Sequence, residues 1–309
     1  MQYPLVSAIV ICYNHARFVT ECLEGVKAQH YPNLELIVHD DASRDDSVAV
    51  IKAWLARCDI PNRLLIQEKN QGVCRSLNHA LSYASGKYVS GIAADDVWLT
   101  GKLLKQVELM ERLPDKVGVV YSDALQIDEE GKPLSWNFIE GHRRFKAMPE
   151  GNIHNVLWEG NFIPSMTTLV RRSCYDQTGL FDETLFYEDW DMLLRLSHWF
   201  DFVYSPEVSA KYRFVATSMA RSQRARMLDA TCQICAKHLD QGYLLPDARR
   251  LALRKFFEFA TASVRNRTPE HRRNFRKAMR MAFGDALAFM LLWRVLSQKI
   301  MRSTFSLAD

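Results

Sequence analysis

The chain has 309 residues, of which 48% are hydrophobic and 25% are charged, as in ordinary globular proteins. This composition excludes a disordered or collagen-like chain, and the seven scattered cysteines exclude a disulfide scaffold and suit a reducing cytoplasm. The formal net charge of +4 conceals an asymmetry, because residues 1–220 carry 22 Lys and Arg against 29 Asp and Glu, whereas residues 221–309 carry 18 against 7.

Hydrophobic patterning predicts alternating strands and helices over the first 121 residues. We expect strands at 6–11, 34–38, 63–67, 88–93 and 117–121. The helices between them are expected at 16–29, 45–57, 73–84 and 101–113. Crossovers of this length between buried strands indicate parallel βαβ units.

The pattern is less regular in the remainder of the chain. Residues 122–165 are rich in Gly, Pro, Asn and aromatic residues and are predicted to be irregular. A strand at 167–170, a helix at 190–200 and short strands at 203–204 and 208–213 around Pro206 are expected next. Only helical patterns follow residue 221, broken by Pro246 and Pro269. The longest apolar stretch, 286–293, has eight residues, too few to cross a bilayer, and no secretory signal is seen, so we expect a soluble or peripheral protein.

Polar residues follow three predicted strands: Tyr13-Asn14, Asp40-Asp41 and Asp95-Asp96. Open parallel sheets bind ligands beyond these carboxyl ends. Each Asp pair alone is better explained as turn or capping residues. Two carboxylate clusters at one edge nevertheless repel each other unless a cation or a hydrogen-bond donor lies between them. Mg²⁺ or Mn²⁺ bound together with a phosphate ligand fits this pattern.

Several common signatures are absent from the sequence. No Gly-x-Gly-x-x-Gly follows the first strand, and no P-loop, Gly-x-Ser-x-Gly or His-Glu-x-x-His motif occurs. The lone Cys232-x-x-Cys235 has no second pair at zinc-finger spacing and is interpreted as two helical cysteines. A Rossmann dinucleotide site, a P-loop NTPase and the commonest hydrolases are therefore disfavoured.

Five segments, in chain order, resemble the successive signatures of family 2 glycosyltransferases. These segments are 6–14, 29–43, 70–78, 86–96 and 179–191, and the resemblance extends over about 4–218. Members of this family are inverting enzymes that use nucleotide sugars and have the GT-A fold. The resemblance implies an α/β catalytic domain over 1–220, with a mainly parallel open sheet sandwiched by helices, followed by a basic α-helical region over 221–309.

The resemblance also implies roles for single residues of a donor site. Tyr13 lies where the family packs the nucleobase, and Asp41 where it hydrogen-bonds the base. Arg75 falls in the segment that approaches the nucleotide phosphates. Asp95 matches the acid that faces the ribose or the sugar, and Asp96 matches the ligand of a divalent metal, Mn²⁺ or Mg²⁺.

The same resemblance implies a catalytic base. Asp189 matches its position, at a predicted helix start that favours the ionised carboxylate. Glu188 is the rival base, and Asp191 is interpreted as structural. In several members a His that ligates the metal stands where this chain has Val215, so metal binding here is expected to be weaker or completed by water.

Two features leave alternatives open. Aromatic residues in the irregular segment are interpreted either as an acceptor-sugar platform or as core; they are Trp136, Phe138, Trp158 and Phe162. The basic C-terminal region is interpreted as a membrane-surface helix, as a helical cap docked on the catalytic domain or as a dimer contact. Nucleic acid is the weakest alternative, because no nucleic-acid-binding motif accompanies the charge.

The resemblance therefore implies an inverting, metal-dependent glycosyltransferase. We expect it to transfer a sugar to a glycan or lipid-linked acceptor in cell-surface polysaccharide or O-antigen-type biosynthesis, in the cytoplasm at the membrane face. A sugar-phosphate nucleotidyltransferase would need a Gly-rich basic loop after the first strand, which the chain lacks. A non-catalytic module that binds nucleotide sugars or scaffolds membrane complexes is the other alternative.

Overall fold

The computed structural model describes residues 3–187, 189–215, 222–285, 287–293 and 295. The chain divides into two compact units. The first, termed the sheet unit, comprises Met1–Ile153, Asn161–Thr184 and Glu188–Val215. The second, termed the helical unit, comprises His154–Gly160, Leu185–Tyr187 and Ala216–Asp309.

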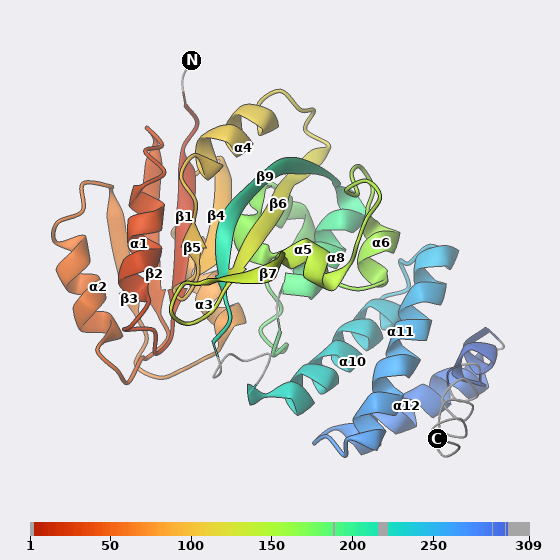
Figure 1. Ribbon diagram of the computed structural model, residues 1–309. Helices are drawn as coiled ribbons and strands as arrows, with labels where there is room; N and C mark the ends of the chain where they lie inside the picture. The colour runs from red at the N-terminus through yellow and green to blue at the C-terminus, as the bar shows by residue number, and fades with distance from the viewer. Residues whose placement is uncertain (1–2, 188, 216–221, 286, 294, 296–309) are drawn as a thin grey trace. The chain divides into compact units, whose positions relative to one another are not determined.

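A nine-stranded sheet forms the centre of the sheet unit, with the strand order β3-β2-β1-β4-β8-β6-β9-β5 and with β7 paired to β6 (Figure 1). The strands are β1 (Val6–Cys12), β2 (Leu34–Asp40), β3 (Asn62–Ile66), β4 (Tyr88–Ala93), β5 (Val97–Trp98), β6 (Val117–Ile127), β7 (Pro133–Asn137), β8 (Leu169–Arg171) and β9 (Asp201–Arg213). The long pairings, among β1 to β4 and between β6 and β9, are parallel. The antiparallel pairings each join only two registered residue pairs. The predicted α/β fold with a mainly parallel open sheet is confirmed.

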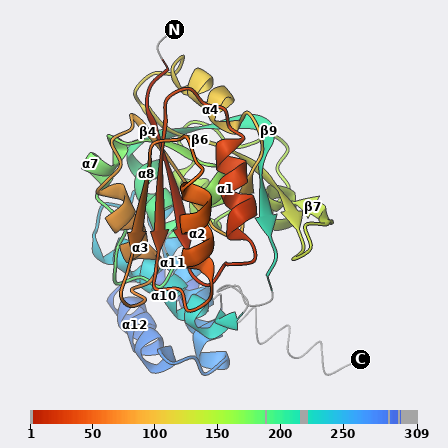
Figure 2. The same ribbon diagram turned by 90° about the vertical axis from the view of Figure 1, so that its left-hand side faces the viewer.

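Helices cover both faces of this sheet. They are α1 (Val19–Lys27), α2 (Ser47–Leu55), α3 (Val73–Leu81), α4 (Lys102–Met110), α5 (Phe138–His142), α7 (Cys174–Thr178) and α8 (Asp189–Trp199). Successive side chains of a strand point to opposite faces, so Val6, Ala8 and Val10 of β1 pack with α1, α2 and α4. Figure 2 shows α1 and α2 side by side on one face of the sheet. Ile9 points the other way and packs with α3. Burial on both faces explains why β1 is a continuous apolar run.

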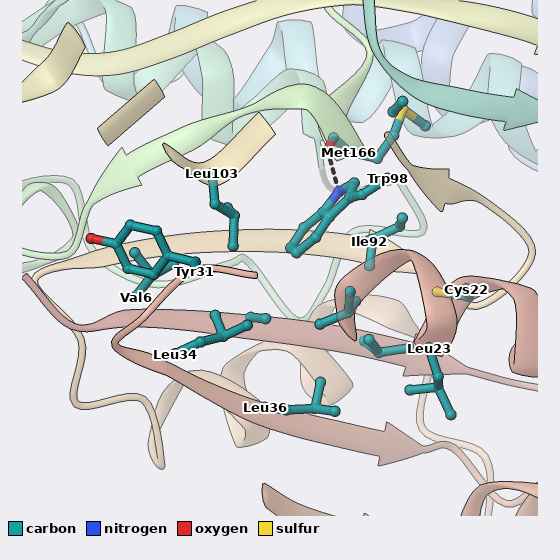
Figure 3. Packing of buried hydrophobic residues seen from close by; sticks show 14 of the residues in the cluster. Val6, Cys22, Leu23, Tyr31, Leu34, Leu36, Ile92, Trp98, Leu103 and Met166 are labelled. Atoms are coloured by element: carbon teal, nitrogen blue, oxygen red, sulfur yellow. Dashed lines mark hydrogen bonds between the residues drawn. The ribbon is translucent and has the colours of Figure 1, made fainter. Parts of the chain in front are cut away.

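The larger core is anchored by Trp98, which lies among side chains from strands and helices (Figure 3). Its indole Nε1–H donates a hydrogen bond of 2.8 Å to the carbonyl oxygen of Met166. A buried tryptophan needs such a partner for its polar atom. The bond fixes the short β5 segment, which directly follows the carboxylates after β4.

Two expectations from the sequence are wrong. The segment 122–165 is not irregular throughout, because β6 continues to Ile127 and β7, α5 and α6 (His154–Trp158) follow. The two short strands expected around Pro206 form a single strand, β9. Pro206 is tolerated because the register of β9 with β6 shifts between Tyr121 and Asp123, so the missing N–H does not interrupt a regular ladder.

The helical unit contains α6 and three longer helices: α10 (Arg224–Asp240), α11 (Pro246–Arg265) and α12 (His271–Gly284) (Figure 1). The expected breaks are confirmed, since α11 starts at Pro246 and α12 starts just after Pro269. Within the ranges described above, no helix combines the length and apolar character needed to cross a bilayer.

Candidate active site

The predicted donor-site residues that follow β1, β2 and β4 lie at one edge of the sheet, because these three strands are neighbours and parallel. Cys12 is in register with Asp40, and Ile11 is in register with Ala93. Beyond the strands, the N–H of Asp41 donates to the carbonyl of Cys12 at 2.9 Å, and the N–H of Ala94 donates to that of Ile11 at 2.9 Å. The segments that begin with Tyr13, Asp41 and Ala94 therefore leave the sheet side by side, about 4.8 Å apart.

Tyr13 is held at the surface by the turn that follows it. Its side chain is 39% exposed, and the next residue, Asn14, has a left-handed φ of 58°. The N–H of Asn14 donates to Ser43 Oγ at 2.8 Å, and Asn14 Oδ1 accepts the N–H of Arg44 at 2.7 Å. This turn thus binds the loop after β2 and leaves the tyrosine ring accessible.

Asp41 is buried, and its carboxylate accepts main-chain hydrogen bonds. Oδ1 accepts the N–H of Gln71 at 2.8 Å, and Oδ2 accepts the N–H of Gly72 at 2.8 Å. Gly72 has φ of 90°, a conformation that favours glycine, and stands directly before α3. Asp41 therefore positions the start of α3, and only the remaining lone pairs of its two oxygens are available to a ligand.

Arg75 lies in the first turn of α3 and is exposed. Its Nε is 3.3 Å from Glu183 Oε2, in an ion pair in which both side chains are about half exposed. Such surface pairs are weak. The guanidinium is therefore free to exchange this partner for a stronger anion.

Asp96 and Asp95 form the acidic pair that follows β4. Asp96 is 3% exposed, and its Oδ1 accepts the N–H of Arg213 at 2.8 Å. Burial and the neighbouring charge of Asp95 raise the pKa of the Asp96 carboxyl well above its usual range. A divalent cation would offset both effects, so these residues fit such an ion.

No cluster of three or more His, Cys, Asp or Glu side chains suited to a metal occurs in the part of the chain that the structure describes. Oxygens of a bound diphosphate, or water, would have to complete the coordination of an ion held by Asp96. Val215 is buried, and its apolar side chain offers no atom to a metal.

Arg213, at the end of β9, holds the acidic loop in place and was not identified from the sequence. It is 2% exposed, its Nε donates to the carbonyl of Asp95 at 2.9 Å and its Nη1 to the carbonyls of Asp128 and Glu129. Its Nη2 pairs with Glu21 of α1. The signal that would have identified it is an arginine between two aromatic residues at a strand end.

His15 is the second neighbour of the acidic pair that the sequence did not single out. Its ring Nδ1 lies 3.5 Å from Asp95 Oδ1, and its main-chain N–H donates a hydrogen bond of 2.9 Å to Ser47 Oγ. The ring therefore faces the carboxylate from the turn after β1. A histidine at this place contributes a polar edge next to Asp95.

Asp189 begins α8, where the helix dipole favours a negative charge. It lines an apolar cavity of about 160 Å³ together with Ile11 and Ala93 of the sheet edge. The cavity extends along the face of the sheet that α3 covers, and it reaches the carboxyl ends of β1 and β4 at Ile11 and Ala93. Asp191 is buried and accepts a hydrogen bond of 3.0 Å from Arg195 Nε, in agreement with its structural interpretation. Glu188 lies outside the described residues.

The aromatic residues of the middle segment separate into core and surface. Trp158 and Phe162 are fully buried and therefore belong to the core. Phe138 is partly buried and stacks on His142 with ring centroids 4.1 Å apart. Trp136 on β7 is half exposed, and the guanidinium carbon of Arg144 lies 4.9 Å from the centroid of its ring.

Sequence comparisons identify a family and similar proteins. The family model for glycosyl transferase family 2 matches residues 7–179. The putative glycosyltransferase EpsE of Bacillus subtilis is 33% identical over 172 residues, 56% of this chain and 58% of that protein. An uncharacterized glycosyltransferase of Rickettsia prowazekii is 28% identical over 215 residues, 69% of this chain and 65% of that protein. The chain thus spans less than two thirds of the length of these relatives.

Solved structures of low sequence identity share the fold. A mannosyltransferase from Pyrobaculum calidifontis, in complex with GDP-Man and Mn²⁺, has a TM-score of 0.63 at 19% identity and covers 97% of this chain and 81% of its own. Staphylococcus aureus TarS in complex with UDP has a TM-score of 0.60 at 17% identity, and the match covers 86% of this chain and 74% of the TarS chain. Since the family model matches more than half of the chain, the protein belongs to glycosyltransferase family 2 and has the GT-A fold.

Proposed function

We propose that the protein is an inverting glycosyltransferase that transfers a sugar from a nucleoside-diphosphate sugar to a hydroxyl of a glycan or lipid-linked acceptor. The proposal extends to cell-surface polysaccharide or O-antigen-type biosynthesis, in the cytoplasm at the membrane face, with a catalytic domain over 1–220. The main support is that the residues after β1, β2 and β4 share one sheet edge, and that the cavity lined by Asp189 reaches this edge at Ile11 and Ala93. The solved neighbours are described with GDP-Man and Mn²⁺ or with UDP.

The donor site would use the exposed ring of Tyr13 for the nucleobase, with Asp41 beside it. Asp96 would hold Mn²⁺ or Mg²⁺, which when bound supplies positive charge to the departing diphosphate, and Asp95 would face the ribose or the sugar. Arg75 would exchange the carboxylate of Glu183 for a phosphate, with which a guanidinium forms bidentate hydrogen bonds. Arg213 would keep the acidic loop in position through its bond to the carbonyl of Asp95.

In the transfer step, Asp189 would accept the proton of the acceptor hydroxyl. The acceptor oxygen forms a bond to the anomeric carbon while the bond from this carbon to the diphosphate oxygen breaks, and the diphosphate leaves with the electron pair. The proton of the acceptor hydroxyl passes to the carboxylate of Asp189, the first residue of α8. Attack from the face opposite the leaving group inverts the anomeric configuration. Glu188 is the alternative base.

The test begins with a thermal-shift screen of nucleotide sugars in the presence of Mn²⁺ or Mg²⁺, followed by transfer assays with the donor that binds. Asp189→Asn should bind this donor as the wild type does, and its turnover should fall by about 100-fold or more, because only proton removal is lost. Asp201→Asn, at the start of β9 in the same unit, is the matched control and should retain its turnover.

Product stereochemistry, read by NMR at the anomeric centre, should show inversion. Near-normal turnover of Asp189→Asn together with inactive Glu188→Gln would assign the base to Glu188. If the protein binds a nucleotide sugar but both substitutions leave its cellular function intact, the proposal of catalysis is wrong and the protein is a non-catalytic module.

A further inference from the structure

The outward face of α12 combines arginines with exposed aromatic rings. Arg272, Arg276 and Arg280 are spaced by four residues and form one stripe along the helix. Phe275 and Phe283 belong to the adjacent stripe and are 51% and 75% exposed. Large apolar rings that remain in water on a helix face indicate an interaction surface when they lie together with a specific charge pattern.

The orientation of this face is fixed by the opposite side of α12. Ala278 and Ala282 are buried there, as is Asn274. Asn274 Nδ2 donates to Asp229 Oδ1 of α10 at 2.8 Å and to Ser263 Oγ of α11 at 3.0 Å. A rotation of α12 that turned Phe275 and Phe283 inward would break these buried hydrogen bonds. The packing of α12 against α10 and α11 therefore keeps the two rings facing outward.

Positive charge on this face is not neutralised locally. In the part of the chain that the structure describes, Arg272, Arg276 and Arg280 form no ion pair. Arg273 and Lys277 pair with Glu270 and Asp240 respectively. All five basic residues line a cleft of about 750 Å³, together with Asp240 and Glu270. The cleft therefore presents at least three uncompensated guanidinium groups, which suit phosphate oxygens.

Further apolar side chains are exposed in the helical residues 287–293 that follow α12. Phe289, Met290 and Trp293 are each at least half exposed. Two consecutive segments of the helical unit thus present aromatic residues to solvent. Since phenylalanine and tryptophan on a basic helix are typical of insertion at the level of lipid headgroups, a membrane surface explains both features together.

We infer that the outward face of α12 binds an anionic lipid surface, with Arg272, Arg276 and Arg280 on lipid phosphates and Phe275 and Phe283 inserted among the headgroups. Charge complementarity favours this occupant, because each arginine near an anionic membrane adds attraction. The inference deepens the membrane part of the proposed function and does not depend on sugar transfer. It concerns the helical unit alone.

The test is co-sedimentation of the full chain with vesicles of phosphatidylcholine that contain phosphatidylglycerol, compared with vesicles of phosphatidylcholine alone. The triple variant Arg272→Glu, Arg276→Glu, Arg280→Glu should lose binding by about ten-fold or more, and raised salt should weaken wild-type binding. The control variant Lys52→Glu, Arg57→Glu, Arg112→Glu changes the net charge equally on the exposed surface of the sheet unit and should bind nearly as the wild type does.

The double variant Phe275→Ser, Phe283→Ser tests insertion separately from charge. Its rings are exposed, so the fold should be retained, which circular dichroism verifies, while vesicle binding should fall about ten-fold. Equal pelleting of wild type and both α12 variants, or tight binding to duplex DNA with none to vesicles, would overturn the inference. Transfer to a soluble acceptor, measured in parallel, should be unchanged by all these substitutions, so that a failed inference and a failed proposal of catalysis are distinguished.

Discussion

Asp96 in the sheet unit and Asp229 in the helical unit are both buried aspartates, and their surroundings are opposite. Asp229 Oδ1 accepts hydrogen bonds from Ser263, Thr268 and Asn274, and its Oδ2 accepts the N–H of Glu270. Asp96 accepts one N–H, from Arg213, and lies beside a second carboxylate. A carboxylate surrounded by donors stabilises the fold, whereas one that is buried beside another acid is suited to a cation.

The contrast has an energetic consequence. The donors around Asp229 compensate for the removal of its charge from water, and this network joins α10, α11 and α12. The raised pKa of Asp96 means that the ionised form, which a metal requires, is disfavoured in the free protein. We therefore expect the ionised carboxylate of Asp96 to lower the stability of the free protein, as is common for residues of active sites.

Removing Asp229 should have the largest effect on stability. Asp229→Ala leaves several buried donors without an acceptor, and each costs about 1–3 kcal/mol, so we expect a loss of about 3 kcal/mol or more in the free energy of unfolding of the helical unit. Urea unfolding followed by far-UV circular dichroism measures this loss. The control is Asp240→Ala, on the same helix α10 as Asp229. It removes a half-exposed partner of Lys277 and should change stability little. Similar losses in the two variants would contradict the assigned network.

Arg213→Lys should have the next largest effect, because it keeps the positive charge and removes the planar set of donors. The carbonyls of Asp95, Asp128 and Glu129 would lose partners inside the protein, and we expect a loss of about 2 kcal/mol in the free energy of unfolding. Chemical denaturation is the measurement. The control is Arg17→Lys, an exposed arginine that reaches the same Glu129. A stability equal to that of the control would show that Arg213 does not hold the acidic loop.

Asp96→Asn should give the smallest change in stability, and the change should be an increase. Asparagine keeps the acceptor for Arg213 and removes a disfavoured charge, so we expect the Tm of the free protein at neutral pH to rise by about 2 °C. Because the folded pKa of Asp96 is raised, wild-type stability falls as pH increases above the unfolded pKa of about 3.9. The difference between variant and wild type should therefore grow from acidic to neutral pH.

Asp41→Asn supplies the opposite control for this experiment. Both Asp41 oxygens accept main-chain N–H groups, so an amide would place its NH₂ against one of these donors and lower the Tm. Differential scanning calorimetry across the pH range compares both variants with the wild type. If Asp96→Asn is destabilising at neutral pH, Asp96 is a structural residue like Asp229.

The edge of the sheet could be predicted from the sequence because the carboxyl ends of parallel strands lie at the same edge. Apolar runs and crossover lengths locate β1, β2 and β4, and the polar residues after them then meet at one edge. What the sequence could not provide is the long-range partner of each group. Arg213 reaches Asp95 from 118 residues away, and Gly72 reaches Asp41 from 31 residues away. No local pattern encodes such contacts, and none distinguishes Asp96 from an aspartate with a full set of donors.

The most direct test of the assigned site is isothermal titration of the donor that the screen identifies, with and without Mn²⁺, into wild type and Asp96→Asn. We expect the wild type to bind at least about ten-fold more tightly with Mn²⁺, and Asp96→Asn to bind equally weakly in both conditions. Equal affinities of the wild type with and without Mn²⁺, or a full Mn²⁺ effect in Asp96→Asn, would contradict the placement of the cation at this carboxylate.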